Sequence, residues 1–158
     1  MMRRTTRLLQ AGSIAAAMLL ALLPLPDAIA PFRPFWMALV LAYWVLEHGD
    51  DCGLGFAFFV GLLLDVVQGT LLGEYALRLV VMAFLLDRFR SRLRFYPIWQ
   101  QVLSIGALLV NDWVVTAIAH AFLGQPQLPL ATLGAAATGA VLWGPVHAML
   151  AALDRGRR

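Results

Sequence analysis

The chain has 158 residues, of which 61% are hydrophobic and 13% charged, and its formal net charge is +3. Because typical soluble domains carry roughly 25% charged residues, a water-soluble fold of this length could not cover so much apolar surface. The composition therefore indicates a single integral membrane domain, residues 1–158. All twelve basic residues are arginines, and ten of them lie in three short clusters beside apolar segments. That distribution follows the positive-inside rule and argues against a nucleic-acid-binding face.

Six apolar segments predict the helices of an all-α transmembrane bundle: 8–24, 34–46, 54–68, 74–87, 97–123 and 128–153. A helix that crosses the hydrocarbon core needs about 20 residues, within a range of about 17–25. The first, fifth and sixth segments reach that length. The second, third and fourth are shorter, so one or two of them could be tilted, broken or re-entrant.

The arginine clusters predict the orientation of the bundle. They precede the first segment, separate the fourth from the fifth, and follow the sixth: Arg3, Arg4 and Arg7; Arg88, Arg90, Arg92 and Arg94; Arg155, Arg157 and Arg158. Six crossings place all three clusters, and both termini, on the cytoplasmic side of a multi-pass protein. Five crossings would strand the last cluster outside, whereas four crossings plus a re-entrant pair satisfy the charges equally well.

The N-terminal residues 1–30 have a second interpretation. A basic start, an apolar stretch and Ala28-Ile29-Ala30 together imitate a signal peptide with its cleavage site. We expect this stretch to be retained as the first transmembrane helix, because further spans follow it.

Asp65 places a carboxylate inside the third apolar segment. A charge at the bilayer centre is disfavoured by about 2.5–3.5 kcal/mol on insertion scales. If the third and fourth segments form a hairpin, Asp65 and Arg78 lie at equal depth on facing helices, and we predict that they pair. Glu74, four residues before Arg78, could share that arginine. The pair either staples the hairpin or belongs to a polar cluster that binds a partner or ligand near the external face.

Gly69 and Gly73 form a literal GxxxG at the point where this hairpin needs a turn. The spacing allows close helix packing in lipid, but glycine is also the usual turn residue, and we favour the turn. Three other pairs of small residues are better candidates for helix packing, either within the bundle or with a partner's helix: Gly12/Ala16, Ala57/Gly61 and Ala135/Gly139.

Asn111 and Asp112 are predicted to be buried polar residues near the middle of the fifth segment. Asp112 has no obvious matching arginine, so we expect it to be protonated or hydrogen-bonded to Asn111, Thr116 or Thr138. A proton or substrate relay is the functional alternative. A catalytic dyad with Asp65 would need two carboxyls that share a proton, and nothing in the sequence brings the two together.

The stretch 87–95 is predicted to be a cytoplasmic loop that carries Arg88, Arg90, Arg92 and Arg94. Such a loop can bind anionic lipid, at about 1 kcal/mol per arginine, or dock a cytoplasmic partner, or only fix the topology. Glu47, Asp50 and Asp51 predict a solvated acidic turn on the same side.

Catalytic and cofactor motifs are missing from the sequence. It contains no phosphate-binding glycine loop and no nucleophile–histidine arrangement in a known context. The single cysteine, Cys52, excludes an internal disulfide, and the three histidines lie too far apart in sequence to suggest a metal site. We expect no cofactor, no metal and no enzymatic activity.

Three motifs resemble those of the MreD family, the bacterial rod shape-determining membrane proteins. They are Arg33-Pro-Phe-Trp36; Gly61-Leu-Leu-Leu-Asp65 with Gly69, Leu72-Gly73 and Ala76-Leu77; and Phe95-Tyr-Pro-Ile-Trp-Gln-Gln101. The resemblance implies a scaffold of the cell-elongation complex in the bacterial inner membrane. It implies MreC as partner, with MreB and the RodA/penicillin-binding transpeptidase pair in one complex that builds lateral peptidoglycan. It also implies a fold similar to the substrate-binding subunits of energy-coupling-factor transporters.

We predict that partners dock near the external face, because helix association in lipid relies on small-residue contacts and hydrogen bonds. The candidate residues are Arg33, Trp36, Asp65, Gly69, Gly73, Glu74 and Arg78. The alternative function is a solute-binding subunit of a vitamin-type transporter. It predicts a pocket lined by Asp112, Trp113 and residues of the sixth segment.

Overall fold

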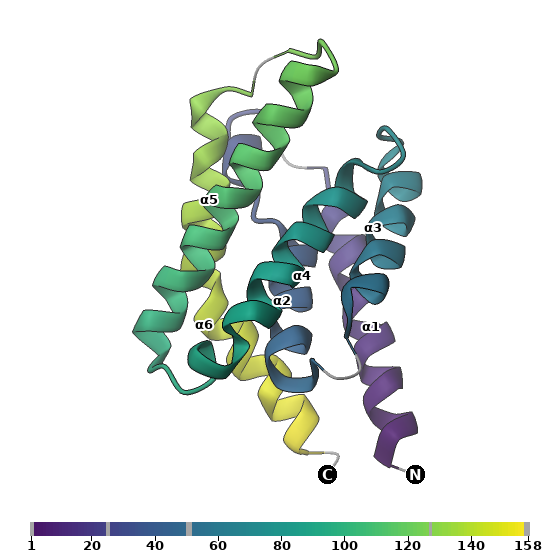
Figure 1. Cartoon of the computed structure of the whole chain (residues 1–158), viewed down its shortest axis with the longest axis vertical. Coiled ribbons are helices and arrows are strands. Elements are labelled where there is room, and N and C mark those ends of the chain that lie inside the picture. The colour runs from purple at the N-terminus through teal and green to yellow at the C-terminus, as the bar shows by residue number, and fades with distance from the viewer. Residues whose placement is uncertain (1, 25, 50–51, 127, 157–158) are drawn as a thin grey trace.

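The computed structural model describes residues 2–24, 26–49, 52–126 and 128–156, with side chains from Thr6 onward. Over these residues the chain is helical and contains no strand (Figure 1). Its elements are α1 Met2–Leu22, η1 Ala30–Phe32, α2 Trp36–His48, α3 Leu54–Gln68, α4 Glu74–Leu93, α5 Ile98–Phe122, η2 Leu130–Leu133 and α6 Gly134–Arg155, where η1 and η2 are 3₁₀ helices. The six predicted helices are confirmed in number and order within this part of the chain. The predicted acidic-turn residues Asp50 and Asp51 and the arginines Arg157 and Arg158 lie outside the described residues, as do the side chains of Arg3 and Arg4.

Three helix boundaries differ from the prediction by six residues, and the first is that α1 begins at Met2 rather than at residue 8. The prediction of a loop at 87–95 is wrong, because α4 continues to Leu93. Arginine and leucine are good helix formers, and basic residues are favoured in the last turn of a helix. The apolar segment therefore ends at Asp87, but the helix continues beyond it. At the other end of the bundle α6 begins at Gly134 rather than 128, after the short helix η2.

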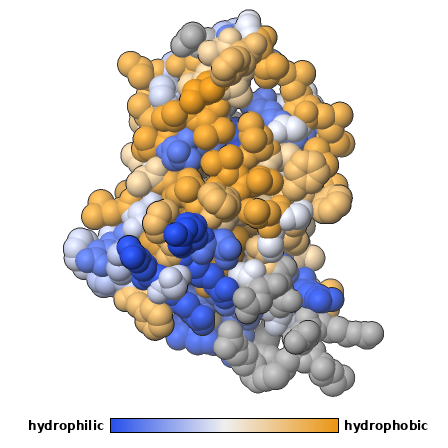
Figure 2. All heavy atoms as spheres, in the orientation of Figure 1, coloured by the Kyte–Doolittle hydropathy of each residue, from blue (hydrophilic) through white to orange (hydrophobic). Residues whose placement is uncertain are grey.

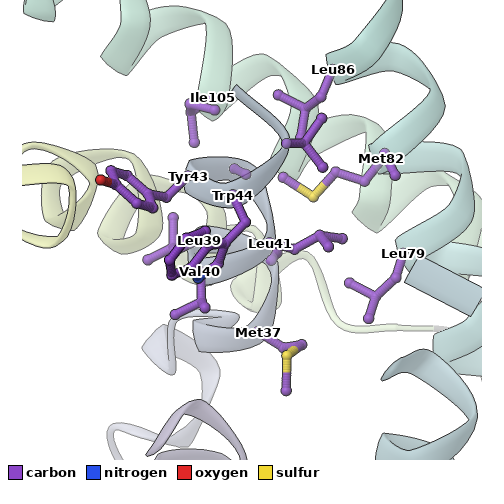
Figure 3. Close-up of a cluster of buried hydrophobic side chains, with 14 of the residues drawn as sticks. Met37, Leu39, Val40, Leu41, Tyr43, Trp44, Leu79, Met82, Leu86 and Ile105 are labelled. Carbon is purple, nitrogen blue, oxygen red and sulfur yellow. The ribbon is translucent and has the colours of Figure 1, made fainter. Parts of the chain in front are cut away.

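Helix α2 forms the centre of the bundle. All ten residues from Met37 to Leu46 are buried, and α2 packs against α1, α4 and α6. Figure 3 shows its side chains extending in several directions, toward Leu79 and Met82 of α4 and Ile105 of α5. A helix that is apolar all round belongs in an interior. At 1.5 Å per residue its 13 residues extend about 20 Å, which is less than a hydrocarbon core of about 30 Å.

The surface has the character of a membrane protein. Two helical stretches of the described chain are long and apolar enough to cross a membrane, Ile98–Phe122 and Leu130–Arg155. Two apolar helices are shorter, Thr6–Leu22 and Leu54–Gln68. Apolar side chains cover most of the face in Figure 2, and hydrophilic residues gather at one end. Helix α1 begins and α6 ends at that same end of the bundle, where the junction of α4 and α5 also lies (Figure 1).

Two of the three small-residue pairs pack inside the bundle. A Cβ atom at Gly61 would overlap the backbone of Ala76, so glycine is required where α3 crosses α4. A Cβ atom at Gly139 would meet the Leu109 side chain of α5. A Cβ atom at Gly12, by contrast, would meet nothing within 4 Å. The Gly12/Ala16 pair therefore has no packing partner within the described chain.

Candidate functional site

Two glycines make the turn between α3 and α4. Gly69 ends α3 with φ 65°, and Gly73 precedes α4 with φ 105°. Residues with a side chain rarely adopt such positive φ values, so glycine is favoured at both ends of the turn. The prediction that this GxxxG forms a turn rather than a helix interface is confirmed.

The Asp65 carboxylate caps the N-terminus of α4. The N–H groups in the first turn of a helix have no partner within the helix, and they carry partial positive charge. Asp65 is only 1% exposed, so its charge is satisfied by these groups rather than by water. Its oxygens accept hydrogen bonds from the backbone N–H groups of Gly73 at 2.8 Å, Tyr75 at 2.7 Å and Ala76 at 3.4 Å, and from the Thr70 hydroxyl at 3.2 Å.

The predicted ion pair between Asp65 and Arg78 is wrong. Arg78 instead binds Asp112 of α5, with Nε 2.9 Å from Oδ1 and Nη2 2.6 Å from Oδ2. The expectation that Asp112 lacks an arginine is wrong for the same reason. Equal depth on neighbouring helices does not fix the direction of a side chain around the helix axis, and Arg78 faces α5 rather than α3.

The Arg78–Asp112 pair is buried, bidentate and flanked by aromatic rings. The side chains are 15% and 7% exposed. The guanidinium carbon of Arg78 lies 4.6 Å from the ring centroid of Phe35 and 4.8 Å from that of Tyr75. Bidentate hydrogen bonds and ring faces together offset the cost of removing the two charges from water. The expected hydrogen bond between the Asp112 carboxyl and Thr116 is not found among the described residues, because the Thr116 hydroxyl donates to the backbone carbonyl of Asp112 instead, at 2.9 Å.

The remaining candidates for partner binding lie around this pair. Glu74 lies 3.7 Å from His120 Nε2, an ion pair when the imidazole is protonated; among the described residues Arg78 donates no hydrogen bond to Glu74. Arg33 donates from Nη2 to the carbonyl of Leu20 at the end of α1, at 3.1 Å. Trp36 is the first residue of α2. The candidates thus gather at one end of the bundle, although Asp65 and Arg78 are occupied by partners within the chain.

An aspartic dyad has no geometric support. The Asp65 carboxylate binds the first turn of α4, and the Asp112 carboxylate binds Arg78. Asn111, which we expected to be buried, is only half-buried, and its side chain makes no hydrogen bond within the described residues.

A cavity of about 210 Å³ opens beside the Arg78–Asp112 pair. Its walls come from all six α-helices, from the loop before α2 and from the stretch that precedes α6. One lining residue from each α-helix, in chain order, is Ala21, Trp36, Leu64, Tyr75, Trp113 and Ala135. Trp113 donates from its indole nitrogen to the Thr132 hydroxyl at 2.8 Å. The residues that the solute-binding alternative named therefore do border one cavity.

The four arginines at the end of α4 have different environments. Arg90 turns inward and donates from Nε to the carbonyl of Leu46, at 3.1 Å, near the end of α2. Arg94 lies 3.9 Å from the Glu47 carboxylate. Arg88 and Arg92 are exposed. Only part of the predicted basic surface is therefore available to lipid or to a partner.

An open groove follows α1 on the side that faces α2 and α6. It has a volume of about 340 Å³, and its walls are apolar or small side chains. The residues of α1 in it are Leu8, Leu9, Gly12, Ser13, Ala16, Ala17 and Leu20. We call this hollow the α1–α6 groove. It includes the small-residue pair that no other described helix covers.

Gln101 is a key structural residue whose role sequence reasoning missed. From α5, its amide nitrogen donates to the carbonyls of Leu93 at 3.2 Å and Tyr96 at 3.1 Å. Its amide oxygen accepts from the indole nitrogen of Trp143 of α6, at 3.3 Å. A glutamine just inside a helix that follows a tight chain reversal could have indicated this role, since buried amides bind free turn carbonyls.

Comparisons with known proteins agree with one another. The family described as rod shape-determining protein MreD matches residues 2–152. The chain is 31% identical over 143 residues to the "Rod shape-determining protein MreD" of Haemophilus influenzae, a match that covers 88% of this chain and 86% of that protein. No solved structure is significantly similar. Both matches name rod shape determination, and neither supports the solute-binding alternative.

Proposed function

This chain belongs to the MreD family of rod shape-determining proteins, and we propose that it is a non-enzymatic scaffold of the bacterial inner membrane. In this proposal it crosses the membrane six times, with both termini in the cytoplasm. It holds MreC and, through the same complex, MreB and the RodA/penicillin-binding transpeptidase pair that builds lateral peptidoglycan. Depletion of the protein should turn rod-shaped cells round, and rods that persist without it would refute the function.

One observation supports a holding role above others: the strongest polar groups are used inside the bundle. Asp65 caps α4, and Arg78 neutralises Asp112. Surfaces that remain for a partner are apolar and rich in small residues, which suits helix packing in lipid. The α1–α6 groove offers such a surface through Gly12 and Ala16. We therefore propose that the single membrane helix of MreC lies in this groove.

The external end contributes to docking in a second way. The turn that Gly69 and Gly73 make presents Leu71 and Leu72, which are 48% and 75% exposed. In this proposal the turn is a contact for the part of MreC beyond its membrane helix. Asp65 supports that contact indirectly, because it fixes the turn on α4.

A Gly12→Ile variant tests the groove. Because a Cβ atom at this position has no atom of the described chain within 4 Å, we expect the fold to be retained and the longer side chain to fill the groove. Overpacking at a close interface costs about 1–3 kcal/mol, so the amount of MreC that co-purifies in mild detergent should fall at least about 5-fold.

The matched control is Ala15→Ile, on the same helix but in the hollow between α1 and α3. It should retain MreC at the wild-type level. Loss of MreC from the control, with full retention by Gly12→Ile, would assign the partner helix to the other side of α1.

The exposed arginines at the end of α4 are proposed to bind anionic lipid. A surface arginine contributes about 1 kcal/mol to such binding. We expect an Arg88→Gln/Arg92→Gln variant to retain several-fold less phosphatidylglycerol than the wild type in native mass spectrometry, with phosphatidylcholine retention unchanged. Arg33→Gln, at the other end of the bundle, is the control. Equal phosphatidylglycerol retention by all three proteins would contradict a lipid-binding role.

A further inference from the structure

The cavity beside Arg78 has a chemical character that a purely structural gap does not need. Aromatic side chains form much of its wall: Phe35, Trp36, Tyr75 and Trp113. Ligand sites typically combine apolar and aromatic walls with a few polar groups that converge on one place. Here the polar groups come from α3, α4, α5 and the loop before α2, so folding brings together groups that are distant in sequence.

The charges that line the cavity do not cancel. Arg33 and Arg78 contribute two positive charges, and Asp112 contributes one negative charge. Asp112 is engaged by Arg78, whereas the hydrogen bond of Arg33 goes to the neutral carbonyl of Leu20. One positive charge of the lining therefore remains uncompensated, on the exposed side of a largely apolar hollow, where electrostatic attraction is still less screened than in bulk water. An anionic guest is favoured over a neutral or cationic one.

Two polar atoms in the wall have spare hydrogen-bonding capacity. Arg78 uses Nε and Nη2 for Asp112, which leaves Nη1 without a partner among the described residues. Gln68 donates from Nε2 to the carbonyl of Ala21, and its amide oxygen has no partner in the described chain. A guest carboxylate could accept from Arg78 and Arg33, and a hydroxyl or amide on the guest could donate to Gln68.

The volume limits the size of the guest. An engineered cavity of about 150 Å³ holds one benzene molecule, and this cavity measures about 210 Å³. It therefore has room for a single ring and one small charged group. We propose that this cavity is a binding site for a small monoanion with a flat apolar body, of the aromatic carboxylate class. The scaffold function does not require such a ligand, so the two proposals stand or fall separately.

The test uses the full chain in phosphatidylcholine nanodiscs, with benzoate as probe and benzamide as its neutral match. Binding is measured by saturation-transfer NMR at millimolar probe concentrations. We expect saturable benzoate binding and at least about 10-fold weaker benzamide binding, since a charge-assisted hydrogen bond is lost. Equal affinity for the two probes, or no benzoate binding in this concentration range, would overturn the proposal.

Two variants locate the site. Arg33→Gln should weaken benzoate binding about 10-fold and leave benzamide unchanged, with Arg92→Gln as the control. Ala135→Phe should fill the cavity and abolish binding of both probes, with Ala137→Phe, on the exposed side of α6, as its match. Circular dichroism checks that each variant is folded. If Ala135→Phe does not fold, the Arg33→Gln variant alone tests whether benzoate binds in this cavity. Undiminished benzoate binding by folded Arg33→Gln would place the probe elsewhere and refute the site.

Discussion

Replacing Asp65 with leucine should lower the free energy of unfolding by about 3–5 kcal/mol, one of the two largest effects we expect in this chain. The carboxylate accepts three backbone N–H groups at the start of α4, and no other described side chain replaces it there. Leucine would leave these donors beside a buried apolar side chain. Unfolding in mixed micelles of mild detergent and dodecyl sulfate, followed by tryptophan fluorescence, measures the loss.

Two further variants separate the cap from the ion pair that the sequence suggested. Asp65→Asn keeps one acceptor oxygen, so it should lose only about 1–2 kcal/mol. The double reversal Asp65→Arg/Arg78→Asp should not recover the stability that each single reversal loses, because Arg78 forms its ion pair with Asp112. Recovery of stability in that double variant would mean that the two residues pair and that the cap is secondary. Val66→Leu, at an exposed position of α3, is the control for a change of side-chain volume.

The order of the helices could be predicted because apolar runs and glycines mark it directly. Helix α3 begins and ends where expected, since Gly53 precedes it and Gly69 ends it. The central place of α2 could not be predicted, because a short apolar run looks the same whether lipid or protein surrounds it. The end of α4 was missed because charged residues end a hydropathy segment without ending a helix.

The polar residues of the site were identified from sequence, but their partners were not. Arg78 and Asp112 are 34 positions apart, and their contact depends on the rotation of α4 relative to α5, which depth alone does not give. The cap by Asp65 left a clearer indication. The turn before α4 holds glycine at the position where a helix usually takes a capping side chain. Asp65, eight residues before that glycine and in the last turn of α3, was available to take that role.

Replacing Arg78 with leucine should lower the free energy of unfolding by about 3–5 kcal/mol, because it leaves the carboxylate of Asp112 buried without a counter-charge. Asp112→Leu should cost a similar amount, since the guanidinium would then lie unpaired between Phe35 and Tyr75. The unfolding assay is the same as for Asp65. Arg88→Leu, an exposed arginine of the same helix, is the matched control and should change stability little.

The double variant Arg78→Leu/Asp112→Leu distinguishes a structural pair from a functional one. Residues in one ion-pair network show coupling energies of about 0.5–3 kcal/mol, and apolar replacements of a buried pair are often neutral, so the double variant should be more stable than either single variant. A coupling energy near zero would contradict the contact. If the pair serves the fold alone, cells that carry the stable double variant stay rod-shaped while both single variants round up. Round cells with a stable double variant would show that the guanidinium and carboxylate themselves serve the elongation machinery, because a purely structural ion pair can be replaced by apolar side chains without loss of function.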